Sequence, residues 1–251
     1  MRTNLAAIAL SCLLATPALA GPYSIGLRAG SSIPNLRAGN DDPVSTGWST
    51  RVAPYFGVFA DFAITPAFSI RPEIAYAAQG GKRDGMQPVP DASSLGFPPG
   101  VSVYANYDNV AKLDYLEIPV LARYRFGAGR GFYVNAGPYA GILLAAKNET
   151  SGASPLYLDA AGTQPVLDQG GNPVSADFNA STDVKGDLNT FNWGLQGGGG
   201  YAHPLGRGTL ELDVRGGLGL ANVQKDTAAN GKNSTGNLVI AAGYSWSLGA
   251  P

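Results

Sequence analysis

The stretch that decides the fold class is Ala67-Phe68-Ser69-Ile70-Arg71-Pro72-Glu73-Ile74-Ala75-Tyr76-Ala77-Ala78-Gln79. Large apolar and polar side chains alternate along it, and a period of two predicts a β-strand with two unlike faces. One face carries Phe68, Ile70, Pro72, Ile74 and Tyr76, and the other carries Ser69, Arg71, Glu73 and Gln79. Such an apolar face points inward in a soluble sheet and outward in a membrane barrel, so the polar face must distinguish the two.

Three further segments, residues 111–126, 208–222 and 236–248, divide their side chains in the same way. Their apolar faces consist of Leu116, Ile118, Val120, Ala122 and Tyr124, of Leu210, Leu212, Val214, Leu218 and Leu220, and of Leu238, Ile240, Ala242, Tyr244 and Trp246. Their opposite faces mix ionised residues with glycine and serine and are not rich in lysine and threonine, as a solvated sheet would be. This mixture favours a crowded barrel interior, with the apolar side chains directed outward to lipid.

The connections between strands alternate in length. We predict strands at 22–32, 51–63, 67–79, 111–126, 131–146, 188–202, 208–222 and 236–248. The connections 64–66, 127–130 and 203–207 are short, whereas 33–50, 80–110, 147–187 and 223–235 are long and rich in turn-forming residues. Tight periplasmic turns at one end and long extracellular loops at the other are typical of outer-membrane barrels. The sequence therefore predicts an all-β fold, an eight-stranded antiparallel up-and-down transmembrane β-barrel.

The amino terminus has the features of a secretory signal peptide. Arg2 precedes a short apolar run, and Ala18-Leu19-Ala20 forms a small-x-small cleavage site. We expect residues 1–20 to be removed and residues 21–251 to form one outer-membrane barrel domain. A lipoprotein would instead use Cys12, but Ala9-Leu10-Ser11 matches the required preceding box poorly. Cys12 is the only cysteine, so residues 21–251 carry none and can form neither a disulfide nor a cysteine-ligated metal site.

The polar faces supply equal numbers of opposite charges to the predicted interior. An eight-stranded barrel is just wide enough for side chains to fill it, and an unpaired ion there would cost several kcal/mol. We therefore predict a structural network of paired charges in the lumen, formed by Arg28, Asp61, Arg71, Glu73, Glu117, Arg123, Arg125, Glu211, Asp213 and Arg215. A charge-lined path for ions is the alternative interpretation of the same residues.

Aromatic residues gather beside the predicted short turns. Amphipathic rings favour the level of the lipid headgroups, where they form girdles around outer-membrane barrels. The predicted periplasmic girdle consists of Tyr23, Phe62, Phe68, Tyr124, Phe126, Phe132, Tyr201 and Trp246.

Composition excludes several classes of function. The formal net charge is −1 and only 14% of residues are charged, so a nucleic-acid partner is not expected. His203 is the only histidine, and with no cysteine after residue 20 we predict no metal, no cofactor and no catalytic site. The run Gly197-Gly198-Gly199-Gly200 lacks the Lys-Ser/Thr of a phosphate-binding loop, and we expect it to permit coiling and make room for large neighbours.

One segment carries a family resemblance. Leu113-Asp114-Tyr115-Leu116-Glu117-Ile118-Pro119-Val120-Leu121-Ala122-Arg123-Tyr124 resembles a signature of outer-membrane β-barrel families of Bacteroidota, including PorT-like proteins. The segments 215–223 and 243–248 resemble the last two strands of that family. The resemblance implies an outer-membrane barrel inserted by the barrel-assembly machinery, a β-bulge at Pro119, and no single activity. Such barrels often end on an aromatic residue, whereas this chain continues to Pro251, so Trp246 or Leu248 would serve instead.

These observations favour a non-enzymatic barrel that anchors exposed loops for recognition or envelope integrity. Loops on a rigid scaffold commonly carry binding, and here the loops 80–110 and 147–187 would meet an unknown ligand or protein. The remaining expected partner is outer-membrane lipid, and the expected location is the cell outer membrane. Three alternatives stay open: a narrow channel, a lipid-modifying enzyme, and a soluble lipocalin-like carrier whose apolar faces point inward.

Overall fold

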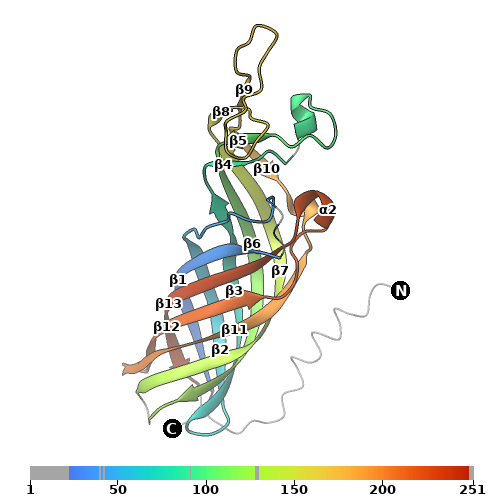
Figure 1. The fold of residues 1–251 in the computed structure, drawn as a ribbon. Helices are drawn as coiled ribbons and strands as arrows, with labels where there is room; N and C mark the ends of the chain where they lie inside the picture. Colours follow the sequence, from blue (N-terminus) through green and yellow to red (C-terminus); the bar gives the residue numbers. More distant parts are fainter. Residues whose placement is uncertain (1–22, 40, 42, 91, 128–129, 249–251) are drawn as a thin grey trace, which may run out of the picture.

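The computed structural model describes residues 23–248 except residues 40, 42, 91, 128 and 129, so the predicted signal peptide lies outside the described residues. Eight long antiparallel strands follow one another around a closed ring (Figure 1), which confirms the predicted barrel. The ring closes where the first strand pairs with the last. Its strands are β1 (Tyr23–Ala38), β2 (Ala53–Ala63), β3 (Phe68–Arg83), β6 (Asp108–Arg125), β7 (Gly131–Ser151), β11 (Phe191–Leu205), β12 (Gly208–Gly219) and β13 (Asn233–Ser247).

Short elements occupy the loops at one end of the barrel. They are β4 (Met86–Pro88), η1 (Ala92–Leu95), β5 (Tyr104–Asn106), β8 (Ala153–Pro155), β9 (Ser175–Asp177), β10 (Ala180–Asp183), η2 (Lys185–Asp187) and α2 (Thr227–Asn230). β4 pairs with β5, β8 pairs with β9, and β10 pairs with the end of β7. In the described part of the chain, no helix is both long and apolar enough to span a membrane. We call this end the loop side, and the end with the tight turns the turn side.

Several strands run further toward the loop side than the sequence predicts. β1 continues to Ala38, β3 to Arg83 and β7 to Ser151, so the predicted edges of three loops are wrong. The backbone ladder persists there, with Ala38 paired to Asn233 in β13. The apolar and polar alternation fades in these extensions, which is why the sequence pattern ends before the hydrogen bonds do.

Two other expectations need correction. Residues 203–205 belong to β11, so the turn to β12 contains only Gly206 and Arg207, with a positive φ of 62° at Gly206. Pro119 does not mark a bulge, because it pairs with Tyr139 in register. The register shift between β6 and β7 lies at Asp114 and Tyr115. Proline has no backbone N–H to donate, and the ladder between β3 and β6 is interrupted at Pro119.

The two faces of the strands have the predicted orientation. Ile74, Leu212 and Ile240 point away from the barrel and are 48%, 59% and 50% exposed. Arg71 and Asp213, from alternate positions, are 0% and 1% exposed in the interior. An apolar outer band around a polar interior is the arrangement of a barrel that spans lipid, and a soluble carrier would have the reverse.

The glycine run in β11 makes room for interior side chains. An added Cβ at the inward-facing Gly200 would collide with the Leu212 carbonyl oxygen and lie 2.5 Å from the Tyr133 hydroxyl. At the outward-facing Gly197 its nearest neighbour would be the Asn135 carbonyl oxygen at 3.6 Å, an ordinary contact. The expectation that these glycines accommodate large neighbours is confirmed at Gly200.

This difference gives a matched pair of substitutions. Gly200→Ala should lower the free energy of unfolding by about 1–3 kcal/mol, the usual effect of overpacking. Gly197→Ala should change it by less than about 0.5 kcal/mol, as outward substitutions usually do. Urea unfolding of the detergent-refolded protein measures both. Equal losses in the two variants would contradict this account of the glycine run.

Candidate functional site

The barrel interior holds a ring of two arginines and two carboxylates near the turn side. Arg71 donates to Asp61 through Nε (3.0 Å) and to Glu211 through Nη1 (2.8 Å). Arg123 Nη1 lies 3.1 Å from Asp61 Oδ2 and 2.8 Å from Glu211 Oε1. Each arginine thus contacts both acids. These four residues are the turn-side cluster, and they come from β2, β3, β6 and β12.

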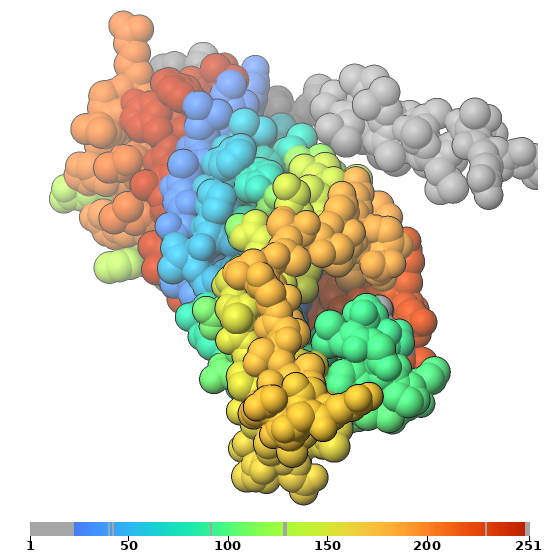
Figure 2. Space-filling model, turned by 90° about the horizontal axis from the view of Figure 1, so that it is seen from above, coloured from blue at the N-terminus to red at the C-terminus, as the bar shows by residue number. Residues whose placement is uncertain are grey.

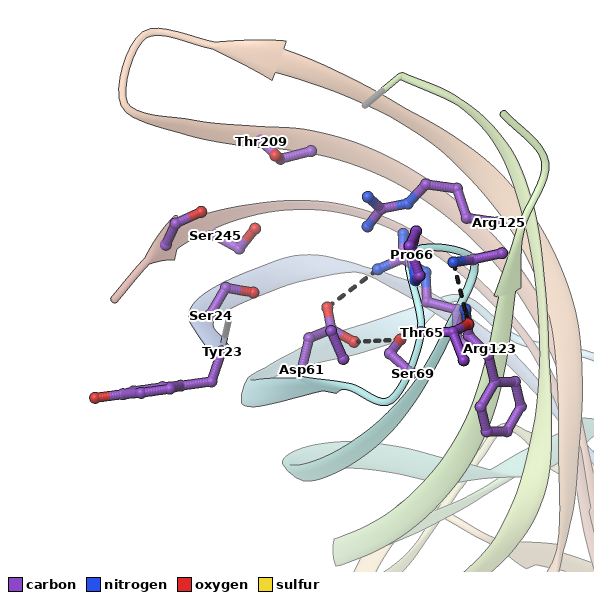
Figure 3. A pocket seen from close by; sticks show the side chains of 14 residues that line it. Tyr23, Ser24, Asp61, Thr65, Pro66, Ser69, Arg123, Arg125, Thr209 and Ser245 are labelled. Atoms are coloured by element: carbon purple, nitrogen blue, oxygen red, sulfur yellow. Dashed lines mark hydrogen bonds and ion pairs between the residues drawn. The ribbon is translucent and has the colours of Figure 1, made fainter. Parts of the chain in front are cut away.

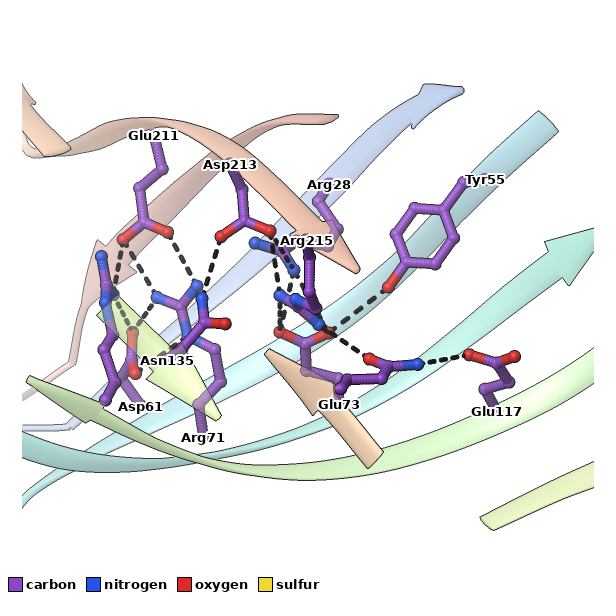
Figure 4. Close-up of polar contacts among 12 residues, drawn as sticks. Arg28, Tyr55, Asp61, Arg71, Glu73, Glu117, Asn135, Glu211, Asp213 and Arg215 are labelled. Carbon is purple, nitrogen blue, oxygen red and sulfur yellow. Dashed lines mark hydrogen bonds and ion pairs between the residues drawn. The ribbon is translucent and has the colours of Figure 1, made fainter. Parts of the chain in front are cut away.

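A second ring of the same composition lies next to it, toward the loop side (Figure 4). Glu73 accepts hydrogen bonds from Arg28 at 3.0 Å and from Arg215 at 2.9 Å. Asp213 Oδ1 lies 3.6 Å from Arg28 Nη1 and 3.2 Å from Arg215 Nη2. All four side chains are at most 2% exposed. These residues form the central cluster.

Aromatic side chains join the two clusters. The Phe59 ring lies between one arginine of each cluster. Its centre is 4.1 Å from Arg71 Cζ and 5.3 Å from Arg28 Cζ. The Tyr133 hydroxyl donates to Asp213 at 2.9 Å, and its ring lies 3.7 Å from Arg123. The interior is therefore filled by ion pairs and by guanidinium groups that lie over aromatic rings, and the pairing offsets the cost of burying these charges.

Two of the ten predicted network residues stand outside these clusters. Glu117 accepts hydrogen bonds from the amides of Gln79 and Gln196, each at 2.7 Å, and no described cation lies within ion-pair distance of it. Arg125 lies at the turn-side mouth, and its guanidinium makes no ion pair or hydrogen bond with a described residue. Four arginines are therefore paired with four acids in the two clusters. The fifth arginine, Arg125, and the fifth acid, Glu117, do not pair with each other, although the predicted network has equal numbers of both charges.

An apolar plug occupies the lumen on the loop side of the central cluster. It was not predicted. Its buried members are Leu36, Ala111, Leu113, Tyr115, Leu143, Ala146 and Leu188, against which Trp48 and Val184 pack. Leu113 and Tyr115 share the inward face of β6 with Glu117, and these large apolar residues on a face that carries charges are the signal that could have revealed the plug.

The side chains that fill the lumen are almost inaccessible to water beyond the turn-side mouth. The side chains of the turn-side and central clusters are at most 2% exposed, apart from Asp61 at 11%. Glu117 and Tyr115, further toward the loop side, are both 0% exposed. A conducting path would expose the groups that line it, so in this conformation the ion pairs and the plug fill the barrel.

The predicted girdle residues surround the turn side. Tyr23, Tyr124 and Phe132 are 44%, 47% and 69% exposed, whereas Phe62 and Phe68 are half-buried. Neighbouring rings meet edge to face: Tyr124 with Phe126, Phe132 with Tyr201, and Tyr244 with Trp246. The outward aromatic rings therefore form local pairs at this level of the barrel.

His203 does not lie in a turn, as the sequence suggested, but in β11, opposite Leu210 and exposed on the outer surface. No hydrogen bond joins its side chain to a described residue. Within the described residues there is also no group of three or more His, Cys, Asp or Glu side chains arranged to hold a metal.

The two longest loops fold together into an ordered head. Tyr104 and Tyr157, one from each loop, exchange backbone hydrogen bonds of 2.8 Å, and Tyr107 stacks on Phe178 with ring centres 4.4 Å apart. The head has its own apolar cluster, composed of Ala92, Val103, Ala105, Tyr107 and Leu156 with Val89, Phe97, Val166, Val174, Ala176 and Phe178. From above, the green and the yellow-to-orange segments stand over one side of the barrel end (Figure 2). The sequence pattern did not indicate that the two loops pack on each other.

Aspartates organise the turns of the head. Asp168 accepts backbone hydrogen bonds from Asn172 (2.9 Å) and Gly170 (2.8 Å). The backbone hydrogen bond from Asn172 contributes most, and together with the bonds from Gly170 and Gly171 it lowers the pKa of the Asp168 carboxyl below its ordinary value. The Asp168 carboxylate thus holds its turn together.

The central cluster can be tested with one substitution and a matched control. Glu73→Gln removes a charge shared by Arg28 and Arg215, and should lower the free energy of unfolding by about 3–5 kcal/mol. Glu149→Gln breaks the exposed pair with Lys112 and should cost about 0–1 kcal/mol. Urea titration in detergent micelles reports both values. A Glu73→Gln loss no larger than that of the control would refute the role assigned to the cluster.

Comparison with known proteins identifies solved structures that resemble this chain at low sequence identity. A search of curated protein sequences finds no match. Ail, the attachment invasion locus protein of Yersinia pestis, is 12% identical over 90% of this chain and 99% of its own, with a TM-score of 0.37. Neisserial surface protein A is 11% identical over 89% and 96%, with a TM-score of 0.38. The outer membrane protease OmpT from Escherichia coli is 10% identical over 90% and 97%, with a TM-score of 0.32. None of these similarities transfers a role to this chain.

The family is established by a match of a different kind. The family model for the outer membrane protein beta-barrel domain matches residues 18–225, which is most of the chain. This confirms the broader part of the resemblance found in residues 113–124. The closed ring of strands, the apolar outer band and this match agree, and the chain belongs to the outer membrane protein beta-barrel domain family.

Proposed function

We propose that this protein is a non-enzymatic outer-membrane anchor that presents its ordered head for recognition at the cell surface. The proposal places the loop side outside the cell and the turn side in the periplasm. One observation carries it: the head has an apolar cluster of its own, separate from the filled barrel. Val103 and Ala105 are 0% exposed there, and Leu156 is 2% exposed.

The separation of head and barrel supports a division of labour. The last paired residues below the head are Arg83 with Asn109, Asp108 with Ser151, and Thr150 with Ala180. The segments 84–107 and 152–179 lie beyond them and hold the whole apolar cluster of the head. Rigid presentation lowers the ordering cost that a flexible loop would incur on binding a partner.

The filled lumen favours an anchor over a channel. Ion-paired clusters and the apolar plug occupy successive levels of the interior, and their side chains are nearly inaccessible to water. An enzyme is disfavoured by the position of His203, the only histidine, which is exposed on the outer face of β11 and makes no hydrogen bond with a described residue. Membership of a narrower PorT-like group, insertion by the barrel-assembly machinery and cleavage after Ala20 stay predictions.

The proposal is tested by removing the head without cutting the barrel. The headless variant lacks 84–107 and 152–179, with an Asn-Gly turn at each junction, since this dipeptide suits a two-residue hairpin. We expect it to fold into a heat-modifiable barrel with unchanged urea stability. A control that lacks only 152–179 leaves Val103, Ala105 and Tyr107 without their partners, and should become protease-sensitive within 84–107.

Two results would contradict the proposal. If the headless variant failed to fold, the head would be part of the barrel's folding unit and not a presented element. If the full-length protein gave discrete conductance steps in planar bilayers, the filled lumen would open, and transport would replace anchoring as the function. We expect both full-length and headless barrels to be electrically silent.

A further inference from the structure

A polar cavity of about 160 Å³ opens at the turn-side mouth of the lumen (Figure 3). Its volume is roughly ten times the minimum needed by one water molecule. Ionised groups line it from one side, namely Asp61, Arg123 and Arg125. The serine and threonine side chains of its lining are Ser24, Thr65, Ser69, Thr209, Ser245 and Ser247.

The charges around the cavity leave one cation without a counter-ion. Asp61 is neutralised by Arg71 and Arg123, which it contacts directly, and Arg123 is also held by Glu211. Arg125 has no such contact with any described carboxylate, although its Nε atom is buried. The turn-side cluster is neutral as a whole, so the mouth of the lumen carries the single positive charge of Arg125.

A wall of hydroxyl groups stands across the mouth from this arginine. Ser24, Thr209 and Ser245 lie on the adjacent strands β1, β12 and β13, where Thr209 pairs directly with Ser245. Their side chains make no hydrogen bond with a described residue, and Ser245 is only 5% exposed. In Figure 3 the Arg125 guanidinium reaches from β6 toward Thr209 and Ser245. The cavity thus offers one planar cation and several free hydroxyl donors.

From this arrangement we propose that the turn-side mouth is a binding site for a phosphate group. A guanidinium presents parallel N–H donors that match two oxygens of a phosphate, and hydroxyls complete the coordination of the others. The phosphate is supplied by inorganic phosphate from the periplasm or by a lipid headgroup. A headgroup would enter over the rim, where Tyr23 and Phe68 line the cavity at the level of the aromatic girdle.

The test uses the full barrel folded in an uncharged maltoside detergent. Calorimetric titrations with inorganic phosphate and with short-chain phosphatidic acid distinguish the two sources. Arg125→Gln should weaken binding by at least about tenfold, because it removes charge-assisted hydrogen bonds to the phosphate. Arg207→Gln is the matched control, because Arg207 is exposed in a turn at the same end but outside the cavity.

The possible outcomes divide cleanly. Binding of either probe that is weakened by Arg125→Gln and unaffected by Arg207→Gln supports the site and identifies its source. Ser245→Ala provides a second variant if Arg125→Gln does not fold, and it should weaken binding while leaving the barrel intact. Absence of binding in both titrations, or equal binding by wild type and the Arg125 or Ser245 variant, would overturn the proposal.

Discussion

The structure depends on one constraint: a closed ring of eight strands sends every second side chain into a space with little room for water. Charges placed there must find partners within the barrel or destabilise it. The chain satisfies this by arranging four arginines and four carboxylates as two adjacent clusters around Phe59. The opposite set of side chains has no such constraint, and it forms the apolar band that lipid surrounds.

The same constraint explains why the interior changes character along its length. Ion pairs fill the half nearer the turns, whereas Leu113, Tyr115 and Leu143 fill the part nearer the loops. Glu117 stands between these regions and is held by two amides, a neutral environment suited to the boundary. Because the barrel is filled in this way, the surfaces that could bind a partner lie at its two ends. The loop side carries the ordered head, and the turn side carries a polar mouth with the unpaired Arg125.

Much of this architecture could be predicted from the sequence, because alternation along a strand is a local property. The pattern in residues 67–79 gave the inward and outward faces, and alternating loop lengths gave the up-and-down order. Partnerships inside the barrel were not predictable, because they join residues as distant as Arg71 and Glu211. The head was missed for the same reason, since Tyr107 and Phe178 contact each other only after two separate loops fold together.

The account is tested most directly by measuring which side chains face lipid. Residues 21–251 contain no cysteine, so single cysteines can be introduced and spin-labelled at Ile74, Leu212 and Ile240 in a bilayer. Collision with oxygen, which concentrates in hydrocarbon, should be high at these positions, and collision with a water-soluble nickel complex should be low. Labels at these sites that were shielded from both reagents would show apolar side chains packed in the interior, and would contradict the orientation on which the whole structure rests.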